Sequence, residues 1–507
     1  MAPVERLSGL DAAFLALEQH HTHLHVMATL VLDPGPSGFT VDTLRDRIAE
    51  RIGNVAPLRR KVVTIPLQIH HPVWWEVDPD LDVHVRQATL SFPGGARELA
   101  NFTARVAAEP LDRDRPLWEM WVVDGLEHGH VAIVAKIHHA CIDGVEIMAH
   151  LLDLEPVAPP SARTITPLHS RAVRAEFSTS EQNDASNMHA VNTDAPNPDG
   201  AGDDTIDDDP QERPSDAVLM RSAIDELVAQ PMRLVRAMRD LAGAAVRMID
   251  KAEHPGRPST ALPLRAPRSA LNRPLSAKRT IAFASLPLDD VKLVRRAFGA
   301  TVNDVLLTVT SGALRRWFEI YSEIPSSPLV IGIPTSVRAR DERGAMGNRF
   351  SAWFVHMALS EPDPVARLNA ISAQTEHAKD LHEEFGSDAM HHWAELLSPV
   401  AYPPALRMYR SVGARMRPIV NAVCSNIPGP RFALYCTDAR VVACYPFGPI
   451  FDGTGLNLTM LSYLDEVGVG IIGCSDAVPG IDDLAAALPE ALGELVKHAS
   501  QAAPNAR

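Results

Sequence analysis

The sequence predicts a mixed α/β (α+β) fold, because strand-like and helix-like segments alternate along most of its length. Residues 23–32 and 116–126 have the apolar, β-branched and aromatic composition of strands, whereas residues 41–52 repeat apolar side chains with helical spacing. A second alternating region begins near Arg279 with a strand followed by a helix. We therefore expect two α/β regions, each with its own sheet.

Further elements are predicted within the second region. Four more segments are expected to be strands of its sheet: 329–333, 351–359, 440–446 and 456–464. Thr301, followed three residues later by Asp304, has the pattern of a capping box, so a helix is expected to begin there. Gly468, Gly470 and Gly473 match the G-x-G-x-x-G pattern of a dinucleotide site. Their surroundings are typical of a strand interior, which argues against such a site.

The length, charge and cysteine content of the chain limit the classes of protein to which it can belong. The chain has 507 residues, 46% of them hydrophobic, which is enough to bury large cores. Its formal charge is −15, but residues 181–216 hold eleven Asp or Glu against one Arg, a net charge of −10 that leaves −5 for the rest. No broad basic surface is expected, which argues against nucleic acid as a partner. The five cysteines are odd in number and form no C-x-x-C pair, which indicates reduced thiols.

The chain divides into four predicted segments. These are an N-terminal half at 1–177, an acidic disordered linker at 178–216, an amphipathic helical connection at 217–276 and a C-terminal half at 277–507. Within the connection, residues 234–249 place apolar side chains on one helical face and arginines on the other. Such a helix suits an anionic lipid surface, although packing against the rest of the protein is the favoured interpretation.

Neither a signal peptide nor a membrane-spanning helix is predicted. Glu5 and Asp11 lie where a signal peptide needs basic and then apolar residues. No run of about 18 uncharged apolar residues occurs. We expect a cytoplasmic protein, with any contact to the inner membrane or to lipid droplets being peripheral.

The segment from Val131 to Gly144 carries the candidate chemistry. An apolar strand broken only by Lys136 ends in His138 and His139, and Asp143-Gly144 forms a turn pair. Extended backbone through the two histidines would send their side chains to opposite faces. One of the two is therefore expected to face a pocket while the other supports the structure.

Three interpretations of the histidine pair compete. A metal site would need more ligands, and the H-H-x-x-x-D spacing fits no usual zinc pattern. Two core histidines would not account for the adjacent pair followed by D-G. A neutral imidazole, with a pKa near about 6.5, can take a proton from an alcohol that attacks an acyl carbon. Cys141 is open to two interpretations, a nucleophile or a small buried side chain. No G-x-S-x-G elbow for a serine hydrolase occurs.

The motif H-H-A-C-I-D-G resembles the H-H-x-x-x-D-G motif of CoA-dependent acyltransferases and condensation domains. The surrounding chain resembles the bacterial wax ester synthase/diacylglycerol acyltransferase family, and the similarity covers nearly everything outside the acidic linker. The matching segments are L-S-G-L-D-A-A-F-L-A-L-E at 7–18, P-L-D-R-D-R-P-L-W-E at 110–119, N-D at 303–304, P-T-S-V-R at 334–338, G-N at 347–348 and S-N-I-P-G-P at 425–430.

This resemblance implies two chloramphenicol-acetyltransferase-like halves with a substrate tunnel and the active site between them. It implies an O-acyltransferase that uses acyl-CoA as co-substrate, without metal or other cofactor. The products would be triacylglycerol from diacylglycerol, or wax esters from long-chain alcohols. By the same resemblance His139 is the general base, His138 supports it, and Asp143 is mainly structural and paired with Arg338.

Further residues match family positions needed for activity, although capping and turn formation explain them almost as well. They are Gly144 of the D-G pair, Asn303 and Asp304, and Ser425, Asn426, Pro428 and Gly429. Two other functions stay open. One is acyl transfer to a specialised hydroxyl acceptor such as a polyketide, and the other is a lipid-binding or lipid-droplet protein without turnover.

Overall fold

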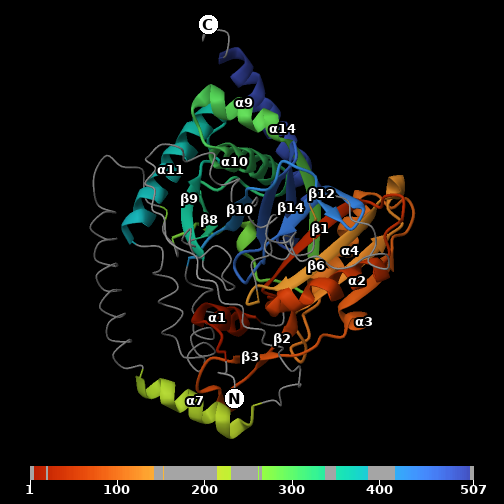
Figure 1. Cartoon of the computed structure of the whole chain (residues 1–507). Helices are drawn as coiled ribbons and strands as arrows, with labels where there is room; N and C mark the ends of the chain where they lie inside the picture. The colour runs from red at the N-terminus through yellow and green to blue at the C-terminus, as the bar shows by residue number, and fades with distance from the viewer. Residues whose placement is uncertain are drawn as a thin grey trace, which may run out of the picture.

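The computed structural model describes residues 5–18, 21–141, 152–153, 214–229, 261, 265–336, 350–385 and 417–502. Within these ranges two six-stranded sheets form the frame of the molecule, and helices pack around them (Figure 1). The main helices are α1 (Gly9–Leu17), α2 (Val41–Arg51), α3 (Leu81–His84), α4 (Ala96–Ala108), α7 (Asp216–Ala229), α9 (Leu288–Phe298), α10 (Val302–Tyr321), α11 (Pro364–Phe385) and α14 (Ile481–Ala502).

The first sheet carries the histidine pair. Its strands, in spatial order, are β11 (Tyr435–Cys436), β12 (Ala439–Phe447), β1 (His25–Asp33), β6 (Val131–His138), β5 (Trp118–Asp124) and β4 (Val85–Thr89). β6 lies between two antiparallel neighbours, β1 and β5. The predicted strand that ends at the histidines and its hairpin with the preceding strand are both confirmed. A separate hairpin joins β2 (Arg60–Val63) and β3 (Val73–Glu76).

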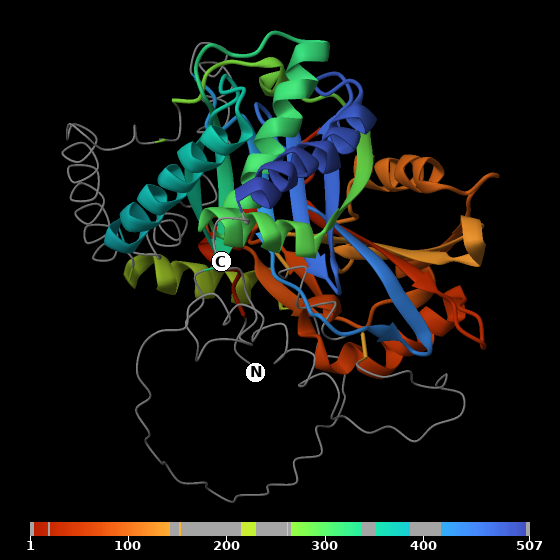
Figure 2. The same cartoon turned by 90° about the horizontal axis from the view of Figure 1, so that it is seen from above.

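The second sheet lies under a layer of helices. Its strands, in spatial order, are β7 (Arg279–Pro287), β14 (Glu466–Cys474), β13 (Leu456–Tyr463), β10 (Ala422–Ile427), β8 (Leu329–Ser336) and β9 (Phe350–Met357). Helices α9, α10, α11 and α14 pack together beside it (Figure 2). The predicted capping box is present: Asp304 N–H donates to Thr301 Oγ1 at 3.1 Å, and Thr301 N–H donates to Asp304 Oδ2 at 2.9 Å.

One predicted strand lies in the other sheet. Residues 440–446 form a strand as expected, but their assignment to the second sheet was wrong, because β12 pairs antiparallel with β1. The pattern of apolar side chains identifies a strand without identifying its partner. Contacts between segments that are distant in the sequence determine that β12 pairs with β1.

Two glycines of β14 allow β12 to cross it closely. A Cβ atom at Gly468 would lie 2.1 Å from Cys444 O, and one at Gly470 would lie 1.9 Å from Pro446 O. Neither position therefore has room for a side chain. The G-x-G-x-x-G run lies inside a strand, as predicted, and its first two glycines serve the packing of the two sheets.

The two regions share elements across the chain. β11 and β12 come after residue 277, yet they complete the sheet that holds β6, and α4 of the N-terminal region packs against β7. Most of the predicted acidic linker and all of the helix predicted at 234–249 lie outside the described residues. In the described part of the chain, no helix is both long enough and apolar enough to cross a bilayer.

Candidate active site

The backbone around the two histidines is held from both sides of β6. His138 N–H donates to Leu117 O at 2.9 Å, and His139 N–H donates to Leu24 O at 2.8 Å. A tight turn follows, in which Cys141 N–H donates to His138 O at 2.9 Å. The two imidazoles therefore project from backbone that neighbouring segments hold in place, as a catalytic side chain requires.

His139 is the more accessible of the two histidines. It is half-buried, and its ring stacks on Phe14 of α1 with 4.5 Å between the ring centroids and 18° between the planes. The stacking restricts the rotation of the imidazole. A partly accessible imidazole with a restricted orientation is suited to proton transfer.

His138 is buried and neutral. Burial, with the charge of Arg113 and the neighbouring His139, lowers its pKa to about 3. Its Nδ1 accepts a hydrogen bond from Ala140 N–H at 3.1 Å, so in the neutral ring the proton lies on Nε2. His138 thus stabilises the turn itself, and its supporting role in catalysis stays a prediction.

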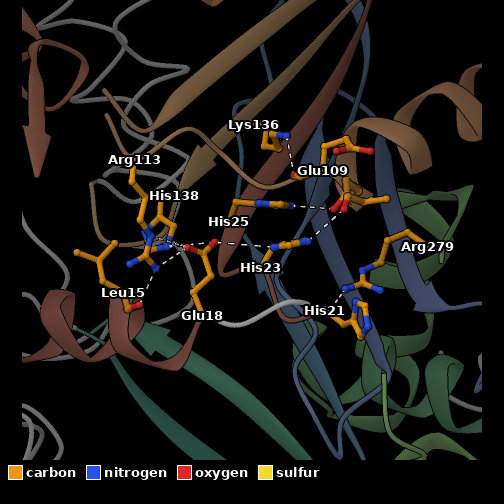
Figure 3. Close-up of polar contacts among 12 residues, drawn as sticks. Leu15, Glu18, His21, His23, His25, Glu109, Arg113, Lys136, His138 and Arg279 are labelled. Carbon is orange, nitrogen blue, oxygen red and sulfur yellow. Dashed lines mark hydrogen bonds and ion pairs between the residues drawn. The ribbon is translucent and has the colours of Figure 1, made fainter. Parts of the chain in front are cut away.

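Glu18, at the end of α1, faces His138. Its Oε1 lies 3.8 Å from His138 Nε2, and its Oε2 accepts a hydrogen bond of 2.7 Å from the Arg113 guanidinium (Figure 3). Arg113 also donates to Leu15 O at 2.8 Å. Arg113 therefore fastens the last turn of α1 to the segment before β5.

Three further polar side chains on this face of the sheet cap the end of α4. His23 Nε2 donates to Ala108 O at 3.1 Å and His25 Nε2 donates to Ala107 O at 3.2 Å. Lys136 Nζ donates to the carbonyls of residues 106 and 109 at 2.9 and 3.0 Å. The last carbonyls of a helix have no partners within it, so these side chains satisfy them. Sequence reasoning missed this set, because no local pattern pairs β1 with α4.

The two interpretations of Cys141 are resolved by its surroundings. The residue is buried, and burial together with the Asp11 carboxylate raises the pKa of its thiol. A thiol nucleophile needs a lowered pKa. Cys141 is a small buried side chain, and all five cysteines are free and buried, in agreement with the prediction of reduced thiols.

The S-N-I-P-G-P segment begins in β10 and leaves it next to β13. Ser425 and Asn426 are half-buried strand residues, and Ile427 packs on the apolar cluster that contains Phe14 and Ala140. Gly429 lies so close to β13 that a Cβ atom would be 2.0 Å from Ser462 O. The second sheet therefore reaches the hydrophobic surroundings of the histidine turn through this segment.

The other candidates divide into two groups. Asp304 is buried, caps α10 and accepts a 2.6 Å hydrogen bond from the Thr375 hydroxyl of α11, while Asn303 is half-buried beside it. These contacts give Asp304 a structural role, and a role for either residue toward substrate stays a prediction. Asp143, Gly144 and Arg338 lie outside the described residues, so the pairing of Asp143 with Arg338 also stays a prediction.

Three of the motifs found in the sequence meet at this turn. Segment 7–18 supplies Phe14 and Glu18, and segment 110–119 supplies Arg113 and the Leu117 carbonyl. The histidines lie at the end of β6 and in the turn after it. Glu18 and Arg113 lie within these motifs, but the sequence alone does not predict that they pair. The signal in the sequence was that each is a charged residue within a motif that also contains apolar residues.

Solved structures of two proteins share this two-sheet fold. The wax ester synthase/diacylglycerol acyltransferase from Marinobacter aquaeolei superposes with a TM-score of 0.65 at 22% identity, over 98% of this chain and 100% of that one. The first condensation domain of the CDA synthetase gives a TM-score of 0.53 at 15% identity, over 99% and 97%. The predicted fold class is confirmed.

Sequence comparison specifies the family. The wax ester synthase/diacylglycerol acyltransferase catalytic domain matches residues 7–306, and the C-terminal domain of the same family matches residues 346–496. A Mycobacterium tuberculosis protein provisionally named a diacylglycerol O-acyltransferase is 33% identical over 98% of this chain and 91% of its own length. The chain belongs to the wax ester synthase/diacylglycerol acyltransferase family, as its motifs predicted.

Proposed function

We propose that this protein is an acyl-CoA-dependent O-acyltransferase in which His139 is the general base. The observation that carries the proposal is the contrast between the two histidines. His138 is buried, neutral and bonded to its own turn, whereas His139 is half-buried and stacked on Phe14. Of these two histidines, only His139 combines a backbone held by neighbouring segments with an accessible ring.

The chemistry follows from a neutral imidazole near a hydroxyl and a thioester. His139 takes the hydroxyl proton while the acceptor oxygen attacks the thioester carbonyl carbon, and the new carbon–oxygen bond forms a tetrahedral intermediate. Collapse of the intermediate breaks the carbon–sulfur bond, and the leaving thiolate of CoA takes the proton from the imidazolium. The ester and free CoA result, and His139 returns to its neutral form. No covalent enzyme intermediate is needed.

Diacylglycerol is the acceptor we propose, with long-chain alcohols as a second class. The family description covers both wax ester and diacylglycerol acyltransferases, and the M. tuberculosis relative is provisionally named for diacylglycerol. Both acceptors are lipids that reside in membranes or droplets. We therefore expect the protein to obtain them through peripheral contact with such a surface.

Substitution of the proposed base tests the mechanism. His139→Ala should lower kcat for transfer of a labelled acyl group from acyl-CoA to diolein by about 10²- to 10⁴-fold, the contribution of a positioned base. His130→Ala, just before the other end of β6, is the matched control and should retain activity. A His139→Ala protein that is folded and fully active would refute the assignment.

Acceptor preference needs a separate assay. Diolein, hexadecanol and a polyketide alcohol should be compared at equal concentration with the unmodified protein. We expect diolein to give the highest kcat/KM. Lipid binding without product from any of the three would contradict the enzymatic function and favour a lipid-binding protein.

A further inference from the structure

The phenyl ring of Phe14 lies face to face with the imidazole ring of His139. The ring centroids are 4.5 Å apart, and the two planes differ by only 18°. Phe14 is 9% exposed, whereas His139 is half-buried. An aromatic ring shielded from water therefore covers one face of the ring that we propose as the base.

Helix α1, which presents this phenyl ring, is held at both ends. At its beginning, Asp11 N–H donates to the Ser8 hydroxyl at 3.1 Å. At its end, the Arg113 guanidinium donates to the Leu15 carbonyl at 2.8 Å (Figure 3). A ring carried by a fixed helix keeps its own orientation. The His139 imidazole that stacks on it is therefore confined to one plane, and its nitrogens exchange hydrogen bonds and protons within that plane.

Proton transfer changes the charge of the stacked imidazole. A general base is neutral before it takes the hydroxyl proton and is an imidazolium afterwards. The face of a phenyl ring carries negative charge and attracts a cation whose distance from the ring centroid is within about 6 Å. A neutral imidazole gains less from the same contact. An interaction that is stronger in the transition state than in the ground state accelerates the reaction.

We propose that Phe14 is a positioning residue for the base: its ring fixes the plane of the His139 imidazole and stabilises the imidazolium that forms as the acceptor hydroxyl loses its proton. The inference rests on the proposed role of His139 and adds a residue to that function. The proton still passes from the hydroxyl to the imidazole and then to the leaving thiolate of CoA. Phe14 exchanges neither protons nor electrons.

Other ionisable groups surround the histidine turn. Among the described residues they are Asp11 of α1, Glu18 at its end, Arg113 before β5, and His138 and Cys141 beside the proposed base. Burial keeps the last two neutral, since it lowers the pKa of the buried imidazole and raises that of the thiol. None of these groups is altered when the phenyl ring is replaced. A change in the titration of the base then reports on the ring.

Phe14→Leu in the full-length protein removes the aromatic face and keeps an apolar side chain. We expect kcat/KM with diolein to fall by about 2- to 30-fold, the range for loss of a cation–π contact. The acid limb of the pH profile should move to lower pH by about 0.4 to 1.5 units, because the imidazolium is less stable. A limb that stays in place or moves to higher pH would overturn the inference.

Fluorinated phenylalanines at position 14 test the same contact without removing the ring. Fluorine withdraws charge from the ring face and changes its shape little, so the variants are expected to fold even if Phe14→Leu does not. Thermal unfolding checks this. The acid limb should move further toward low pH with each added fluorine. A limb that does not depend on the number of fluorines would count against stabilisation of the imidazolium.

Phe102→Leu is the matched control. Phe102 is 7% exposed and meets Trp121 edge to face, with 5.5 Å between the ring centroids, in a different apolar cluster from Phe14. Its loss should lower the melting temperature but leave the acid limb in place. Equal shifts of the limb in Phe102→Leu and Phe14→Leu would assign the effect to general loosening of the core and refute the proposed contact.

An NMR titration of the His139 ring gives a readout that needs no turnover. The histidine signal absent from His139→Ala identifies the ring. Its titration midpoint should lie at lower pH in Phe14→Leu than in the unmodified protein, and an equal or higher midpoint would refute the inference whether or not the protein is active. An unmodified protein that is inactive on all acceptors would refute the proposed function instead, so the two failures are distinguishable.

Discussion

Lys136 and His138 lie two residues apart on the same face of β6, yet their surroundings differ. Lys136 is fully buried, and its ammonium group contacts the Glu119 carboxylate at 2.6 Å and two carbonyls at the end of α4 at 2.9 and 3.0 Å. All three of its protons have acceptors. His138 has a carboxylate 3.8 Å away that it does not contact directly.

The difference between the surroundings of Lys136 and His138 indicates that Lys136 belongs to the structural scaffold and His138 to the candidate site. A buried polar network whose members are all bonded stabilises one packing of the chain. A buried group with unused hydrogen-bonding capacity is expected where a ligand, a water or a reaction requires it. The Lys136 cluster therefore joins β6 to α4 and β5, whereas Glu18 pairs with Arg113 and so links the end of α1 to the segment before β5.

Removal of the ammonium group should give the largest effect on stability. Lys136→Met would leave Glu119 and two helix carbonyls without their partner, and we expect the free energy of unfolding to fall by about 3 kcal/mol. Urea denaturation measures it. Lys292→Met is the control, since Lys292 pairs with the exposed Asp289 and such pairs contribute about 0–1 kcal/mol. Equal losses in the two variants would contradict a scaffold role for Lys136.

Acid should destabilise the folded protein, because its buried histidines are kept neutral. Burial lowers the pKa values of His23 and His138 to about 4 and 3, and that of His25 well below 6.5. Between those values and 6.5 the unfolded chain binds more protons, so stability is complete above pH 6.5 and is lost as the pH falls. Each neutral buried histidine contributes a slope of about 1.4 kcal/mol per pH unit in this range.

His23→Gln measures one of these contributions. The amide N–H of Gln can replace His23 Nε2 at the Ala108 carbonyl, but it does not titrate. Urea denaturation at pH 7, 6 and 5 should show a shallower fall in stability for the variant, by about one histidine's slope. Parallel curves for the variant and the unmodified protein would show that His23 is not kept neutral by the fold.

Arg113→Lys should have the smallest effect on stability. The Arg113 side chain is 52% exposed, and exposed ion pairs contribute about 0–1 kcal/mol. A lysine can pair with Glu18 but cannot reproduce the fork that also bonds the Leu15 carbonyl. We expect kcat to fall by a few-fold with little change in unfolding free energy. A change in stability without a change in kcat would place Arg113 with the scaffold instead.

Local patterns predicted most of the elements. The run that ends at His138, the hairpin before it, the helix at 41–52 and the capping box of Thr301 and Asp304 depend on neighbours within a few residues. The partner of β12 was predicted wrongly for the opposite reason. Its pairing with β1 joins residues about four hundred positions apart, and no local pattern encodes it.

In the candidate site too, local patterns predicted some features and contacts between distant segments set the others. His138 and His139 were identified from one motif, and the structure gives them different environments, buried for His138 and half-buried for His139. Glu18 and Arg113 are 95 residues apart, and they meet only because α1 packs beside the segment that leads into β5. The pairing of Asp143 with Arg338 has not been tested and stays a prediction.

The sequence by itself determined the family, the type of fold and the strand whose end carries two histidines, since residue types at short spacing encode all three. Only the tertiary structure decided which histidine is buried, which strand of the C-terminal region completes the N-terminal sheet, and that a carboxylate from α1 stands between His23 and His138. The physical reason is that burial, desolvation and ion pairing depend on which distant segments exclude water from a side chain.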